Sequence, residues 1–181
     1  INIPSTVTTM AQNVFRDCTS LTTVIFANGI QLTSIPKEAF YNTALSGIDI
    51  PASVTNIGTS AFRRCNKLAE VNIPATTQLT TINDYAFAEC AILPSFAMPN
   101  TVTTIGAGAL YSCPLLKTVT LSNKLTTIPN ETFRKCSLLN NVTIPRSVSS
   151  LGTNSFRECT SLSSIVITNS VTAMGTSVFE D

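Results

Sequence analysis

The chain has 181 residues, of which 44% are hydrophobic and only 12% are charged, and its formal net charge is +1. Because 11 Lys and Arg are balanced by 10 Asp and Glu, no basic stripe is available to displace phosphate counterions, and a nucleic-acid partner is not expected. The chain has no His, which excludes Ser-His-Asp triads, Cys-His dyads and histidine zinc sites within it. We therefore expect no enzymatic activity, no cofactor and no bound metal.

Apolar residues are spread evenly along the chain instead of forming one long run. No stretch approaches the ~20 apolar residues that a membrane-spanning helix needs, and Ile1 is not followed by the charged and apolar regions of a signal peptide. We expect no membrane insertion by this segment. A chain of this length can bury about 70% of the surface that its unfolded form exposes. We therefore expect either one domain with its own hydrophobic core or one solenoid segment.

A repeat of about 23 residues runs through the whole chain. Each copy is expected to open with a short strand of alternating inward and outward side chains, as in Ile48–Ile50, which Pro51 then stops. Two longer steps of the repeat mark loop insertions near Gln31 and Gln78. The apolar residues that open the strands are Ile1, Val24, Ile48, Val71, Phe96, Val119, Val142 and Ile165.

A second extended segment and a turn complete each copy. In the reference copy the second segment is Val54–Ile57, and Gly58 marks the corner that follows it. Phe62, Cys65 and Leu68 then stand at i, i+3 and i+6. That spacing is typical of a short helical or 3₁₀ turn leading into the next strand.

Two apolar columns are expected to face one continuous core. The first contains Phe15, Phe40, Phe62, Phe87, Leu110, Phe133, Phe156 and Phe179, and the second contains Met10, Ile35, Ile57, Ile82, Ile105, Ile128, Leu151 and Met174. No single copy could bury its apolar edge alone, whereas stacked copies share one core. With parallel strands about 4.8 Å apart, eight copies would extend over about 35 Å.

The pattern I-x-I-P-x-S-V-T-x-I-G-x-x-A-F-x-x-C-x-x-L is complete between Ile48 and Leu68. Its P-x-S-V and C-x-x-L elements recur at residues 145–148 and 159–162, while Leu110 replaces Phe and Thr43 replaces Cys in two copies. On these motifs the chain resembles the BspA-like class of leucine-rich repeats, which are typically large surface or secreted proteins of bacteria and some protists. The resemblance implies an extracellular or cell-surface location and adhesion to matrix or cell-surface proteins or glycoproteins.

The predicted fold class is an α/β solenoid. We expect a right-handed leucine-rich repeat superhelix with a parallel sheet on one face and short helical or 3₁₀ turns on the other. Residues 1–181 should form a single domain of about eight repeats of 23–25 residues. Because neither end shows the polar cap that shields a solenoid core, the chain is expected to be a segment of a longer array, and its ends could support self-association.

The six cysteines form a further column of the repeat, comprising Cys18, Cys65, Cys90, Cys113, Cys136 and Cys159. Their spacing copies the repeat period and lacks the paired CxxC arrangement of metal sites. We therefore expect a structural core ladder of reduced, buried thiols, with a disulfide ladder or a soft-metal site as the alternative. In an oxidising compartment such thiols would stay free only through burial.

The solvent-facing centre of the first strands is the candidate partner-binding surface. Repeat proteins generally bind large partners on this face because it is broad and rigid. The face lacks Trp and Tyr anchors, so no single hot spot stands out. The candidate residues are Asn2, Ile25, Asp49, Asn72, Ala97, Thr120, Thr143 and Val166, together with the flanking Glu70.

Columns of Thr and Ser, which include Thr103 and Thr104, are expected to form a solvated surface on the second extended segments. Flat arrays of Thr can also bind ice, and this function is kept as an alternative. It requires hydroxyls on one flat face, whereas two consecutive Thr residues here lie on a bend between buried neighbours.

Charged residues of both signs follow the turns, and we expect them to form a mixed, solvated face. A weak contact between an anionic glycan and Arg134, Lys135 and Arg157 is the alternative. Two sequons begin at Asn130 and Asn141, and they matter only in a eukaryotic secretory pathway.

Two functions are consistent with these features. The first is a non-catalytic adhesion module whose sheet face binds proteins or glycoproteins of a matrix or a neighbouring cell. The alternative is a structural spacer or self-assembling surface-layer repeat without a specific ligand, which the low charge and neutral faces would suit.

Overall fold

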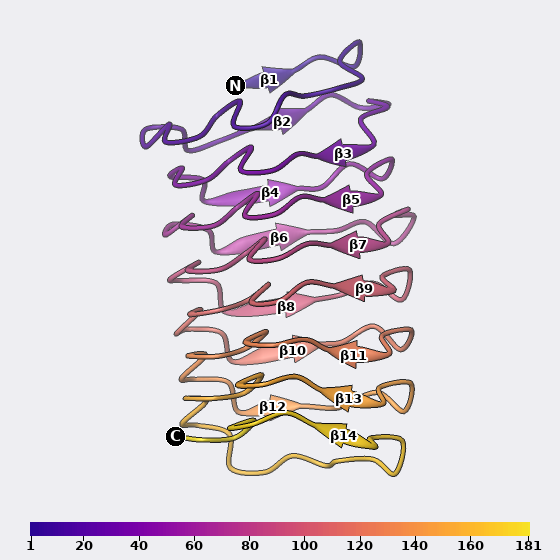
Figure 1. The fold of residues 1–181 in the computed structure, drawn as a ribbon. Helices are drawn as coiled ribbons and strands as arrows, with labels where there is room; N and C mark the ends of the chain where they lie inside the picture. Colours follow the sequence, from indigo (N-terminus) through magenta and orange to yellow (C-terminus); the bar gives the residue numbers. More distant parts are fainter.

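The computed structural model describes all residues from Ile1 to Asp181 as one stack of coils. Figure 1 shows the chain winding from the N-terminal coil at one end of the stack to the C-terminal coil at the other. We number the coils 1 to 8, beginning near Ile1, Val24, Ile48, Val71, Phe96, Val119, Val142 and Ile165. Coils 2 to 7 follow the same path of a strand, a corner, a second strand and a turn segment.

The first strands of the coils form one face of the stack. They are β1 (Asn2–Ile3), β2 (Ile25–Phe26), β4 (Gly47–Asp49), β6 (Glu70–Asn72), β8 (Ser95–Ala97), β10 (Thr118–Thr120) and β12 (Asn141–Val142). They pair in parallel as β1-β2, β4-β6 and β8-β10-β12. The register matches equivalent repeat positions, so that Ile48 lies opposite Val71 and Val119 lies opposite Val142.

The second strands form another parallel face, which the sequence analysis did not assign as a sheet. They are β3 (Ser34–Ile35), β5 (Asn56–Ile57), β7 (Thr81–Ile82), β9 (Thr104–Ile105), β11 (Thr127–Ile128), β13 (Ser150–Leu151) and β14 (Ala173–Met174). They pair as β3-β5-β7-β9 and β11-β13-β14. The solenoid therefore has parallel strands on two faces instead of one.

The predicted helical or 3₁₀ turns are wrong, because the structure contains no helix. In the turn of coil 3 the N–H groups of Ser60, Phe62 and Arg64 donate to carbonyls of the next coil at 2.8 to 2.9 Å. The N–H groups between them bond three residues back, as Ala61 does to the Gly58 carbonyl at 3.1 Å. Ser60 and Arg64 have φ of 56° and 63°. These left-handed residues interrupt any right-handed helical run, so the segment is a series of β-turns and the fold is a β-solenoid.

The core is one cluster of 44 buried residues that runs the length of the stack. At its centre the predicted Phe column forms parallel ring stacks. The rings of Phe40 and Phe62 have centroids 5.2 Å apart, and those of Phe62 and Phe87 are 5.1 Å apart. Leu110 interrupts the ring stack between Phe87 and Phe133 and is itself fully buried. Such offset aromatic contacts stabilise beyond the area that they bury.

The core prediction fails for several residues of the terminal coils. Cys18 is exposed rather than buried, and Met174 and Phe179 are 59% and 40% exposed. Elsewhere in the stack these column positions are covered by coils on both sides. Coils 1 and 8 each have a neighbouring coil on one side only, so the same positions face solvent there.

Gly58 lies where two coils approach too closely for a side chain. A Cβ atom there would be 2.6 Å from the Lys37 nitrogen and 2.7 Å from the Pro36 carbonyl carbon, both in the backbone of the preceding coil. By contrast, a Cβ atom on Gly47 would lie 3.6 Å from Glu70, at ordinary contact distance. The glycine of the I-G element therefore permits the close approach of coil 3 to the main chain of coil 2.

We expect the Gly58→Ala variant to be destabilised by roughly 1 to 3 kcal/mol, because the new methyl group overpacks a contact with main-chain atoms that cannot move independently. Gly47→Ala is the matched control and should be neutral or slightly stabilising, since it restricts the unfolded chain without a clash. Denaturant unfolding monitored by circular dichroism measures both variants. Equal stability of the two would contradict this account of the glycine.

Candidate functional site

The candidate sheet face is exposed as the sequence analysis expected. All eight predicted strand-centre residues and Glu70 are solvent-exposed, and the large apolar side chains among them are Ile25 at 55% and Val166 at 75%. Parallel pairing brings equivalent residues side by side, as for Asp49 and Asn72 or Ala97 and Thr120. An isolated bridge continues the row from Thr143 to Val166. The predicted residues thus lie in one row on consecutive coils.

Three shallow hollows adjoin this row. The largest has a volume of about 670 Å³ and includes Val166 and Arg146. The second has a volume of about 480 Å³, is formed by the loop around Gly29 and the strand end after Asp49, and includes Gln78. The third has a volume of about 320 Å³ and includes Thr120, Thr143 and Pro145. All three are open depressions of the surface and not enclosed pockets. The face can therefore accept side chains of a partner without enclosing a small molecule.

The chemistry of the sheet face is neutral and polar with isolated apolar groups. The Asn72 amide donates a hydrogen bond of 2.9 Å to the Asp49 carboxylate, and the Glu70 side chain makes no ion pair. No aromatic ring lies among the predicted residues. The face offers hydroxyl and amide groups at regular intervals, and Ile25 and Val166 are its exposed large apolar side chains.

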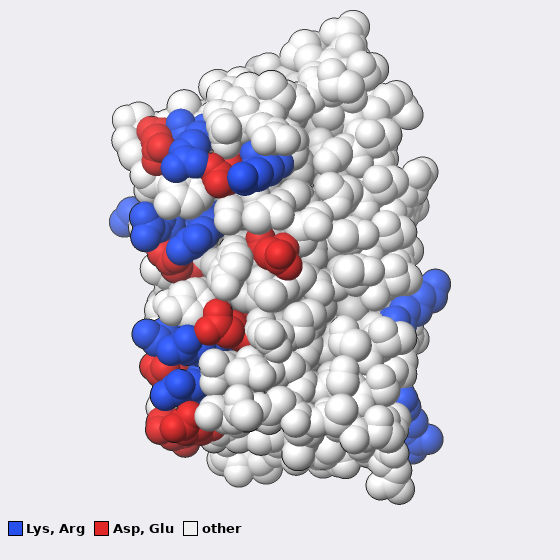
Figure 2. All heavy atoms as spheres, viewed as in Figure 1, with Lys and Arg blue, Asp and Glu red and all other residues white.

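Most charged side chains gather instead along the turn segments. Figure 2 shows Lys, Arg, Asp and Glu concentrated at one edge of the stack, while most of the remaining visible surface is uncharged. Ion pairs connect adjacent coils along this edge, as between Arg16 and Glu38 or between Arg157 and Glu180. Arg134, Arg157 and Lys135, the candidates for an anionic-glycan contact, each lie within 4.0 Å of an acidic group. Their charge is therefore largely neutralised within the protein.

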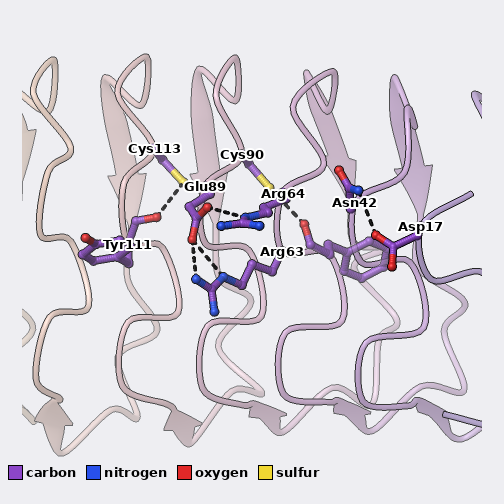
Figure 3. Close-up of polar contacts among 9 residues, drawn as sticks. Asp17, Asn42, Arg63, Arg64, Glu89, Cys90, Tyr111 and Cys113 are labelled. Carbon is purple, nitrogen blue, oxygen red and sulfur yellow. Dashed lines mark hydrogen bonds and ion pairs between the residues drawn. The ribbon is translucent and has the colours of Figure 1, made fainter. Parts of the chain in front are cut away.

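Glu89 is the centre of one of these networks. Its carboxylate accepts hydrogen bonds from Arg63 at 2.5 and 2.9 Å and from Arg64 at 2.7 Å (Figure 3). Partial burial raises the pKa of Glu89, but the hydrogen bonds from Arg64 and Arg63 outweigh this effect and lower that pKa below its ordinary value of 4.5. The ion pair thus joins coils 3 and 4 at the turn edge.

The turn edge also holds all three tyrosines of the chain, which the sequence analysis did not single out. Tyr41 carries the Arg16 guanidinium 4.7 Å above its ring. The Tyr85 ring lies 5.4 Å from the Arg63 guanidinium and edge-on to Tyr111 at 6.3 Å. Cation–π contacts of this kind add to the rigidity of the edge. The signal available in the sequence was the recurrence of Tyr and Arg within two residues of the Phe column.

The cysteine ladder is internal and structural for five of its six members. The Cys90 thiol donates to the Phe62 carbonyl at 3.3 Å, and the Cys113 thiol to the Phe87 carbonyl at 3.2 Å. Figure 3 shows a longer contact of 3.9 Å from the Cys113 thiol to the Tyr111 carbonyl. Cys65, Cys136 and Cys159 bond to the preceding coil in the same way. All six cysteines are free, and no group of three or more His, Cys, Asp or Glu is placed to hold a metal ion. The structure also has no helix that could cross a bilayer.

A family model described as "BspA type Leucine rich repeat region" matches residues 1–79 and 68–181, with six copies of the repeat. The two matched ranges together extend over the whole chain. No curated protein matches the chain.

Several solved structures share the fold. A leucine-rich repeat protein from Eubacterium ventriosum is 23% identical with a TM-score of 0.74, covering 99% of this chain and 57% of the other. The pneumococcal vaccine antigen PcpA is 22% identical with a TM-score of 0.66, covering 97% and 57%. A leucine rich cell surface protein from Faecalibacterium prausnitzii is 29% identical with a TM-score of 0.59, covering 97% and 59%. The chain thus spans little more than half of each of these proteins.

Thiol reactivity should distinguish Cys18 from the other cysteines. Burial raises the pKa of Cys65 to about 11 and that of Cys113 to about 12, so at pH 8 these groups remain thiols that are inert to aromatic disulfide reagents. We expect one fast-reacting thiol in the native protein and six after denaturation in guanidinium. The Cys18→Ser variant should lose the fast phase, and several fast thiols in the native protein would contradict the buried ladder.

The Glu89 network predicts a pH-dependent contribution to stability. Because the folded-state pKa is lowered, the stabilisation is fully present above the unfolded-state value and is lost as the pH falls through the folded-state pKa. Glu89→Gln should therefore lower the free energy of unfolding by about 1 kcal/mol at pH 7. This difference should shrink progressively below the ordinary carboxyl value of 4.5.

Unfolding curves at several pH values measure this difference. Glu70→Gln is the control, because the Glu70 carboxylate makes no ion pair. The difference in unfolding free energy that Glu70→Gln causes should therefore not shrink at low pH as that of Glu89→Gln does. A Glu89→Gln effect that is the same at pH 3 and pH 7 would show that the ion pairs are not its source.

Proposed function

The chain belongs to the BspA-type leucine-rich repeat family, and we propose that it is a non-catalytic, cell-surface or secreted module that binds proteins or glycoproteins through its first sheet face. The observation that carries the proposal is the row of exposed residues at equivalent positions of eight consecutive coils, from Asn2 to Val166. A rigid, regular face of this kind suits recognition of a large surface.

Three further observations support this proposal. The row adjoins three open hollows, which can receive partner side chains. The face contains few charges, so binding there would need little desolvation of ions. The names of similar structures include a cell surface protein and a vaccine antigen, which supports the location at the surface of a cell.

A structural spacer or surface-layer repeat is the second candidate function. The Thr-rich second face favours it, because Thr104 and Thr127 are exposed at matching positions of β9 and β11 and offer no anchor for a specific partner. In this role the residues of the first face would be freely replaceable without loss of function.

A binding assay with charge substitutions separates the two candidates. The chain is applied to immobilised matrix glycoproteins and cell-surface glycans, in parallel with a triple variant in which Asn72, Thr120 and Thr143 are changed to Arg. We expect saturable binding that the triple variant loses by at least tenfold, because three large cations would be buried without partners at the interface.

The matched control places the same charges on the second face, by changing Thr104, Thr127 and Ala173 to Arg. This variant should bind as the unmodified chain does. Equal loss in both variants would indicate a general charge effect, and an absence of saturable binding to every panel member would favour the spacer role.

A further inference from the structure

The corner of coil 2 is shorter than the corners of the other coils. Leu68 follows Phe62 by six positions, whereas Leu45 follows Phe40 by only five. In all six coils with a cysteine, the N–H of the following Leu donates to the cysteine carbonyl, as Leu68 does to Cys65 at 3.0 Å. Leu45 makes no such bond. The deletion of one residue thus removes the tight turn that closes this corner elsewhere.

Three consecutive backbone donors at this corner have no acceptor within the protein. The N–H groups of Thr43, Ala44 and Leu45 donate no hydrogen bond. Thr43 and Leu45 are only 4% and 0% exposed, and a buried N–H without an acceptor is unfavourable. Successive free N–H groups are a recurrent feature of anion-binding concavities.

A hollow of about 160 Å³ lies over this corner. It spans coils 1 to 3, and no acidic residue contributes to its wall. Its lining consists of Thr19, Asn42, Thr43, Ala44, Arg64, Asn66 and Lys67. The volume is enough for a single small group of a ligand and too small for a drug-sized molecule.

The two cations of the wall differ in how they are held. Arg64 is anchored through its Nε, which donates to Glu89 at 2.7 Å (Figure 3), and its guanidinium lies 5.9 Å from the centre of the Tyr41 ring, while its terminal nitrogens donate no hydrogen bond to a carboxylate. Lys67 makes no ion pair. Asn42 also lines the hollow, and its amide is fixed by a 2.8 Å hydrogen bond to Asp17. Asp17 and Glu89 therefore hold two of the wall residues in place without themselves lining the hollow.

We propose that this hollow binds a small oxyanion group, a carboxylate or a sulfate. The Lys67 ammonium and the free guanidinium nitrogens of Arg64 would supply the charge, and the unpartnered backbone N–H groups of Thr43 and Ala44 would supply directional hydrogen bonds. This site is separate from the first sheet face and does not depend on the function proposed for that face.

Backbone amide NMR of the complete chain during titration with sodium acetate or sodium sulfate at constant ionic strength tests the site. We expect saturable shifts of the amides of Thr43, Ala44 and Leu45 with millimolar dissociation constants. The two salts distinguish the sources of the group, since tighter binding of acetate indicates a carboxylate ligand and tighter binding of sulfate indicates a sulfate ester.

Lys67→Gln should weaken this binding about fivefold or more. Lys117→Gln is the matched control, since Lys117 is also exposed and unpaired but lies away from the hollow, and it should leave the binding unchanged. Asn66→Ala, which removes a donor without changing the net charge, should also weaken the binding. Non-saturable shifts, or equal effects of the Lys67 and Lys117 variants, would overturn the proposal.

Discussion

Hydrogen bonding between coils is the constraint on which this structure depends. The strands are only two or three residues long, so none of them could persist without the equivalent strand of the next coil. The same requirement extends into the turns, where every second N–H group donates to a neighbouring coil. Buried main-chain groups must find such partners. The repeat period is fixed because each coil has to present its donors and carbonyls at the same heights as its neighbours.

The features that this fixed period determines could be predicted from the sequence. Apolar residues one repeat apart occupy the same place in neighbouring coils. The pairing of Ile48 with Val71 and the stacking of Phe40 on Phe62 could therefore be derived from the repeat spacing alone. The turn conformation could not be predicted, because residues at i and i+3 meet in a helical turn and in successive β-turns alike. Tyr85 and Glu131 adopt left-handed φ of 54° and 57° although neither is a residue type that signals it.

The surface could be predicted only in part for a related reason. Alternation along a strand identified the outward residues of the first face, because neighbours there are one repeat apart. The turn edge combines residues at unequal separations, such as Arg63 with Glu89 at 26 residues and Tyr85 with Glu131 at 46. Their contacts depend on side-chain length and on the offset between coils. As a result, the ion pairs that join coils lie at the turn edge, while the first sheet face contains few charges.

Regularity itself limits what a solenoid can recognise. A partner that recognises only what adjacent coils share, such as the hydroxyl groups of Thr120 and Thr143, would meet a similar surface one coil further along and could bind in more than one register. Departures from the repeat remove this ambiguity, and coil 2 contains two of them. Its loop around Gly29 contributes to the 480 Å³ hollow beside the first face, and its shortened corner at Thr43 opens the 160 Å³ hollow near the turn edge. A ligand that engages either feature would be fixed at one position along the stack.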